Sequence, residues 1–228
     1  SAFVGSFFPA YLFAFAETEI SSSVTAVMVS LTPLFTLLIS VIIFGEELLK
    51  KQVIGVIIGF LGIVVLINNE LLSSSFNLLY VMFIVLAAFC YAVNANLLKY
   101  KLPNIPALGI VFMSFLFMFI PAFIVLFFSE FPFSDFTSDP LILESIVYIV
   151  ILALFGTAIA KVMYIKLLAI STPVFSVSTT YLMPVVAIFW GLLDGEEFKL
   201  TQFIGTSIIL IGVYLVTKKK APIKDASN

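Results

Sequence analysis

A repeated segment constrains this chain more than any other feature of its sequence. Residues 33–62 and 184–212 each begin with a proline and an apolar run. In both, the run ends at Gly-Glu-Glu, and a glutamine and two glycines follow. Six matches lie 150 positions apart: Gly45, Glu46, Glu47, Gln52, Gly55 and Gly62 pair with Gly195, Glu196, Glu197, Gln202, Gly205 and Gly212. Upstream the offset is 151, as for Gly5 with Gly156 and Pro33 with Pro184. Chance does not readily produce this constancy, so the chain contains two copies of one structural unit.

The composition places these units in a membrane. The chain is 62% hydrophobic and 11% charged, with a mean hydropathy of +1.24, whereas soluble domains are about a quarter charged. Apolar runs of about 18 residues or more can cross a bilayer as helices. Because period-two alternation is absent and the runs are too long for barrel strands, the sequence predicts an all-α polytopic membrane protein. The expected helices are 2–16, 21–44, 52–69, 77–98, 106–128, 143–168, 173–193 and 201–217.

The lysines predict the orientation of these helices. One side of the membrane receives nine lysines, the other receives Lys199 with most of the acidic residues, and Lys161 lies within a helix. By the positive-inside rule the lysine-rich side and the polar tail 218–228 are cytoplasmic, which indicates a multi-pass protein of the cell (inner) membrane. The lysines are scattered over short loops, so we expect no nucleic-acid partner. The partners we expect are the lipid bilayer and a small-molecule substrate.

Counting the crossings gives the relation between the two copies. Five predicted helices separate the first Gly-Glu-Glu from the second, so the two motifs lie on opposite sides of the membrane. The sequence therefore predicts an inverted repeat, which is a signature of secondary transporters that alternate around a site near the midplane.

Several motifs support a family resemblance. They are Tyr91-Ala92, Gly156-Thr157-Ala158 through Tyr164-Ile165-Lys166-Leu167-Leu168, Tyr181-Leu182-Met183-Pro184-Val185, and Gly195-Glu196-Glu197 with Gln202, Gly205 and Gly212. With these residues the chain resembles the EamA-type family of the drug/metabolite transporter superfamily over essentially its whole length. The resemblance implies ten helices in two inverted units of five, and substrates that range over amino acids, other metabolites and toxic compounds.

The chain departs from this pattern in its first unit. Residues 77–217 hold five predicted helices, whereas residues 1–69 hold three. We therefore expect eight of the family's ten transmembrane helices here, with residues 1–69 as the last three helices of a truncated first unit. Transport is accordingly predicted for the intact protein.

Two motifs have mainly structural interpretations. The paired glutamates at 46–47 and 196–197 follow a helix stop and lie at a membrane surface near the start of the next helix, where the helix dipole favours negative charge. Gly55, Gly59 and Gly62 share a helical face, which favours close packing inside the bundle over dimerisation. We expect a monomer or a weak homodimer.

Polar residues inside the spans predict a substrate cavity near the midplane. Tyr91 and Asn94 share one face of 77–98, and Thr157, Lys161 and Tyr164 form a stripe at i, i+4 and i+7 of 143–168. The predicted substrate-binding residues are Tyr91, Asn94, Thr157, Lys161, Tyr164, Thr180 and Tyr181, and Pro33 and Pro184 are predicted helix kinks. For the hydroxyls, bonding to their own helix is an equally good interpretation of each alone, but their symmetric placement favours the cavity.

Lys161 has two open interpretations. An intramembrane lysine costs on the order of 3 kcal/mol and indicates function, where it would meet a substrate carboxylate or the acidic partner of a proton relay. Alternatively its side chain snorkels to the cytoplasmic interface.

The sequence thus predicts a secondary transporter, working as an exporter, of small metabolites such as amino acids, by alternating access. Proton coupling and exchange both stay open. A nucleotide-sugar or sugar-phosphate exchanger and a non-transporting scaffold are the alternatives. With no histidine and one cysteine, Cys90, we find no catalytic residues, no metal site and no cofactor, so an enzyme is not expected.

Overall fold

The computed structural model describes residues 1–20, 25, 28–47, 49–66, 78–128, 140–183, 186, 193 and 200–217. These residues form helices, turns and short connections, with no strand among them. The elements are η1 (Phe3–Phe7), α1 (Phe8–Ala16), α3 (Thr32–Ile42), α4 (Lys50–Leu66), α6 (Leu78–Lys101), α7 (Ala107–Phe128), α8 (Pro140–Ile151), η3 (Leu152–Ile159), α9 (Ala160–Ile170), α10 (Pro173–Ser178), η4 (Thr179–Leu182) and α12 (Leu200–Thr217). Each predicted helix therefore has a helical counterpart in the structure.

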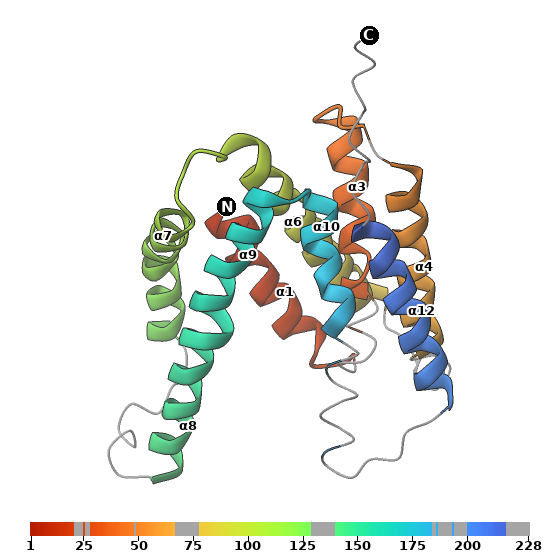
Figure 1. Cartoon of the computed structure of the whole chain (residues 1–228). Helices are drawn as coiled ribbons and strands as arrows, with labels where there is room; N and C mark the ends of the chain where they lie inside the picture. The colour runs from red at the N-terminus through yellow and green to blue at the C-terminus, as the bar shows by residue number, and fades with distance from the viewer. Residues whose placement is uncertain are drawn as a thin grey trace.

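The helices form one bundle whose two edges differ (Figure 1). At one edge α4 and α12 lie side by side next to α3, and at the opposite edge α7 lies beside the long α8–η3–α9 helix. Between the edges lie α1, α6 and α10, with α6 packed against both α1 and α3. The central α6 thus connects the two halves of the chain.

Three described helices are long and apolar enough to cross a membrane. They are Leu78–Lys101, Ala107–Phe128 and Glu144–Ile170, and Phe3–Ala16, Thr32–Ile42 and Phe203–Val216 are shorter apolar helices. In the most apolar window of Glu144–Ile170 no residue is buried within the protein. Apolar surface of this extent needs an apolar environment, which a bilayer supplies.

The glycines of the repeat form a close backbone contact between α4 and α12. A methyl group on Gly212 would lie 2.5 Å from the backbone nitrogen of Gly59, and one on Gly62 would lie 2.7 Å from that of Ile209. The two backbones can therefore touch only because these side chains are absent. The glycine stripe packs α4 against α12 inside one chain, as the sequence predicts.

Two short π-helical segments interrupt the regular helices. In η1 the Phe8 N–H bonds to the carbonyl of Phe3, five residues earlier. Pro9 has no N–H to offer the Gly5 carbonyl, which instead accepts from the Ser6 hydroxyl at 2.7 Å. The second segment, η3, contains Gly156, the repeat counterpart of Gly5. π-Bulges occur frequently at functional sites.

Several hydroxyls in the helical segments bond to backbone carbonyls three or four residues earlier. Thr32 Oγ1 donates to the Val29 carbonyl at 2.6 Å, and Thr36 Oγ1 donates to the Thr32 carbonyl at 2.8 Å. Asn96 is instead a tie between elements: its Oδ1 accepts from Ser40 Oγ at 2.7 Å and its Nδ2 donates to the carbonyls of Ala92 and Thr36. This fully bonded amide joins α6 to α3.

Candidate functional site

The lysine inside the bundle contacts two other elements. The Lys161 ammonium, on α9, donates a hydrogen bond to Ser6 Oγ of η1. It also lies 5.5 Å from the centroid of the Phe115 ring of α7, within cation–π range. The Ser6 hydroxyl gives its own hydrogen to the Gly5 carbonyl, so its lone pairs are free to accept from the lysine. Lys161 thus joins α9 to η1 and α7.

Asn94 reaches the same π-helical segment from α6. A methyl group on Gly5 would lie 2.5–2.6 Å from the side-chain amide of Asn94, so the amide rests on the glycine backbone. Asn94 is 6% exposed, and its Oδ1 has no hydrogen-bond partner within the described part of the chain. Gly5 and Ser6 are neighbours in sequence, so Asn94 and Lys161 contact adjacent residues of η1.

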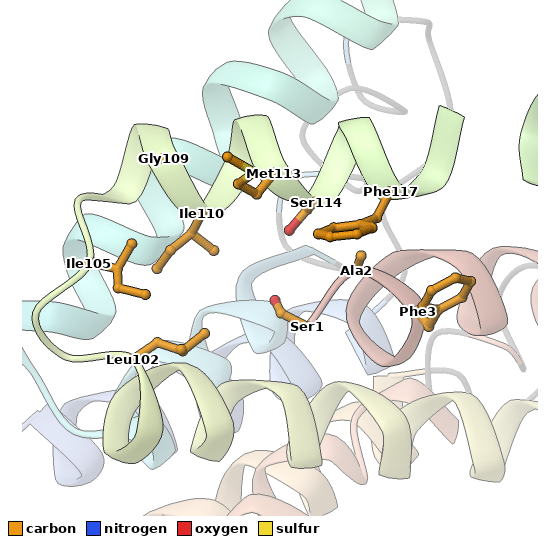
Figure 2. A pocket seen from close by; sticks show the side chains of 10 residues that line it. All are labelled: Ser1, Ala2, Phe3, Leu102, Ile105, Gly109, Ile110, Met113, Ser114 and Phe117. Carbon is orange, nitrogen blue, oxygen red and sulfur yellow. The ribbon is translucent and has the colours of Figure 1, made fainter. Parts of the chain in front are cut away.

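A cavity of about 410 Å³ opens beside this segment (Figure 2). Its walls are the first residues of the chain, the connection between α6 and α7, and one face of α7. The lining side chains are mainly apolar, and the hydroxyls of Ser1 and Ser114 face each other across the space. Two of the elements that line this cavity, η1 and α7, also contact the Lys161 ammonium.

Two predicted tyrosines pack around the polar residues. Tyr91 is half-buried on α6 and stacks on Phe13 of α1, with ring centroids 5.9 Å apart. Tyr164 of α9 packs with Phe115 against the cluster of Leu98, Ile110, Val111, Ile165 and Leu168. Both lie on helices that carry a polar group of the site, one beside Asn94 and one beside Lys161.

Two predicted residues lie at the α4–α12 edge instead. Tyr181 is completely buried, packs with Ile63 and Ile209, and donates from its hydroxyl to the Val56 carbonyl at 3.1 Å. Its ring covers Gly59, where a methyl group would lie 2.5 Å from it. Thr180 Oγ1, in η4, donates to the carbonyl of Val177, three residues earlier in α10, at 2.8 Å.

Thr157 is exposed, whereas Lys161 is half-buried. The expected stripe assumed a regular α-helix, but Thr157 lies in η3, and π-helical turns hold more residues than α-helical ones. The angular relation between these two residues therefore differs from the i, i+4 expectation.

Pro33 stands in the first turn of α3, directly after a turn at Ser30 and Leu31, and Pro184 lies outside the described residues.

Ser6, Gly5 and Phe115 were not among the residues that the sequence predicted for the site. The repeat carries the signal for Ser6, because at the offset of 151 it corresponds to Thr157, and each follows a glycine in a π-helical segment. Phe115 is one of 26 phenylalanines, and no local pattern distinguishes it. Among the described residues no group of three or more histidine, cysteine or acidic side chains could hold a metal ion.

Comparisons with known proteins point to one family. A sequence model described as the EamA-like transporter family matches residues 1–68 and 78–218. An uncharacterized transporter of Archaeoglobus fulgidus is 29% identical over 209 residues, which are 90% of this chain and 71% of that protein. The uncharacterized inner membrane transporter YedA of Escherichia coli K12 is 28% identical over 204 residues, 89% of this chain.

The chain spans 64% of the length of YedA. A solved crystal structure, 17% identical, shares the fold with a TM-score of 0.75 over 95% of this chain and 74% of the solved chain. Both the all-helical bundle and the apolar spans agree with a multi-pass membrane protein. Because the family model matches nearly every residue, this chain belongs to the EamA-like transporter family.

Proposed function

We propose that the intact protein is a secondary transporter, working as an exporter, that moves small metabolites such as amino acids by alternating access. In this proposal two inverted units of five helices, represented here by residues 1–69 and 77–217, rock against each other around an interior site. The observation that carries the proposal is the reciprocal form of the α4–α12 contact.

The contact is reciprocal because the repeat offset of 150 residues converts one contact between α4 and α12 into another. The offset is added to the α4 residue number and subtracted from the α12 residue number. A methyl group on Gly212 would meet the nitrogen of Gly59 at 2.5 Å, and the shifted pair, Gly62 with Ile209, gives 2.7 Å. A methyl group on Gly212 would also meet the Gly55 oxygen at 2.7 Å, and the shifted pair, Gly62 with the Gly205 oxygen, gives 3.0 Å. A contact that maps onto itself is what a two-fold axis produces.

The direction of the two helices supports an axis in the membrane plane. Along the contact, residue numbers rise on α4 as they fall on α12, so the helices run antiparallel. Such an inverted arrangement lets two equivalent units exchange conformations and open the site to either side in turn. The match of one family model to two segments, 1–68 and 78–218, agrees with two units.

The interior polar groups support a site between elements of both units. Ser6 and Gly5 belong to the first unit, whereas Asn94 and Lys161 belong to the second. A substrate bound there would contact both moving parts, which is the requirement for coupling its binding to a change of access.

The test is transport by the purified protein in liposomes. Vesicles loaded with a mixture of amino acids should exchange them for the same radiolabelled compounds outside, and protein-free vesicles should not. Exchange of nucleotide sugars or sugar phosphates in place of amino acids would favour the exchanger alternative. If neither group is exchanged, although binding-competent protein is present in the vesicles, the scaffold alternative stands.

We also propose that the lysine-rich loops face the cytoplasm. The support is the distribution of lysines, including Lys99 and Lys101 at the end of α6. In a Cys90→Ala background, Lys101→Cys should react with a membrane-impermeant thiol reagent in inverted vesicles and not in intact cells. The opposite labelling pattern would reverse the orientation.

A further inference from the structure

We propose that Lys161 anchors a carboxylate group of the transported molecule, and that Asn94 Oδ1 accepts a hydrogen bond from a donor on the same molecule. This inference rests on the proposed transport function, because it names the chemical class of that substrate. It selects the carboxylate interpretation of Lys161 over the proton relay and over snorkelling.

The first support is the unused capacity of the lysine. An ammonium carries three N–H donors, and one of them is given to Ser6 Oγ. In the described part of the chain its other contact is the face of Phe115, so no carboxylate accompanies the charge there. The ammonium therefore retains two donors for a ligand.

Lys99, in contrast to Lys161, uses its ammonium donors within the protein. Lys99 Nζ donates to the carbonyls of Leu168 at 2.9 Å and Ala169 at 3.0 Å. These are the last carbonyls of α9, where a cation is favourable. Lys99 thus has a structural role that satisfies it, whereas Lys161 contacts one neutral hydroxyl and a ring.

The free-energy cost of an unpaired buried charge indicates which ligand group would complete the site. A charged group away from bulk water is costly unless it is paired, and inside a membrane such a residue faces an interior site by default. One lysine supplies a single positive charge, which matches a carboxylate monoanion better than a phosphate dianion. A Ser6 hydroxyl whose hydrogen is already given to Gly5 cannot bind the anion itself, but it holds the ammonium in place.

Asn94 supplies an independent observation. Its side chain is 94% buried, as 6% is exposed, and its Oδ1 has no partner in the described residues. Nearby Asn96 is buried with both its side-chain atoms bonded, so the helix does not in general leave amides unsatisfied. Leaving a buried acceptor unpaired destabilises the fold. A hydroxyl or ammonium group on the ligand would remove this destabilisation.

The ring of Phe115 lies 5.5 Å from the ammonium, so one side of the lysine is apolar. A small organic acid with an apolar body fits this chemistry better than a large polar sugar.

The experiment uses probes that share one isobutyl skeleton. The three carboxylates are 4-methylpentanoate, 2-hydroxy-4-methylpentanoate and leucine, and each is compared with its amide by thermal-shift titration of the purified protein. We expect the carboxylates to bind and the amides to bind roughly 10- to 100-fold more weakly, as is typical for loss of a hydrogen bond to a charged group. The two carboxylates with a donor at C2 should bind more tightly than 4-methylpentanoate.

The variants separate the two residues. Lys161→Met should abolish the preference for carboxylates over amides, while Lys161→Arg, which keeps the charge, should retain it. Asn94→Leu should abolish the advantage of a donor at C2 and keep the preference for carboxylates. Lys166→Met is the matched control, since Lys166 is exposed on the same helix, and it should bind as the wild type does.

The outcomes distinguish the site from the function. Transport that persists with an unchanged carboxylate preference in Lys161→Met overturns the site and leaves the transport proposal standing. Equal binding of carboxylates and amides by the wild type, or no binding of either, also overturns it. Carboxylate binding that needs Lys161, in a protein that transports nothing, supports the site and contradicts the proposed function.

Discussion

Substituting Gly212 by alanine tests the packing of α4 against α12. The added methyl group would lie 2.5 Å from the nitrogen and 2.6 Å from the Cα of Gly59, and 2.7 Å from the oxygen of Gly55. Non-bonded carbon atoms pack favourably at about 3.5 Å or more. The two helices must therefore move apart by about 1 Å to accept the methyl group. All three obstructing atoms belong to the backbone and cannot rotate away.

The expected change in the free energy of unfolding is the sum of two opposing contributions. Overpacking costs about 1–3 kcal/mol, and the rigid backbone places this site near the upper value. Alanine has a higher helix propensity than glycine by about 1 kcal/mol. The net loss in the free energy of unfolding is therefore about 2 kcal/mol. For a chain of this size that lowers Tm by roughly 4–8 °C.

The assay is thermal unfolding of the detergent-solubilised protein, followed by circular dichroism. Gly62→Ala should lower Tm by a similar amount, because its methyl group would lie 2.7–3.0 Å from atoms of Ile209 and Gly205. Gly109→Ala is the control: the nearest atom is Ile105 Cγ2 at 3.8 Å, so helix propensity alone should act and Tm should not fall. A Tm of Gly212→Ala at or above that of the wild type would refute the close contact.

Two further predictions use the same assay. Asn96→Leu removes the hydrogen bonds to Ser40, Ala92 and Thr36, so we expect a loss of about 1–3 kcal/mol, and an unchanged Tm would contradict the tie between α6 and α3. Burial raises the pKa of Glu46 above its ordinary value of 4.5, against an opposing effect of Lys99, so the folded protein binds this proton more readily than the unfolded chain and loses stability as pH rises through the raised pKa. Glu46→Gln should therefore raise Tm at pH 7 and lose that advantage below pH 4.5; a constant difference over this range would show that the carboxyl group is not the cause.

The sequence by itself determined the class of protein. Hydropathy and run length are properties of the chain that need no knowledge of its neighbours, and each helix that the structure describes overlaps a predicted one. The repeat also identified Gly55, Gly62 and Gly212 as packing residues, because a conserved offset between glycines is readable before any contact is known.

The tertiary structure decided which polar residues share a site. Helical phase placed Thr157 with Lys161, but the π-helical segment before α9 changed that phase. Tyr181 has the polarity expected of a cavity residue, yet Gly59 leaves room for its ring at the α4–α12 edge. Ser6 became part of the site because Pro9 cannot donate to the Gly5 carbonyl, and Lys161 of a distant helix lies opposite. Such partners are set by how helices cross in space, and one-dimensional periodicity describes only which face of a single helix a residue occupies.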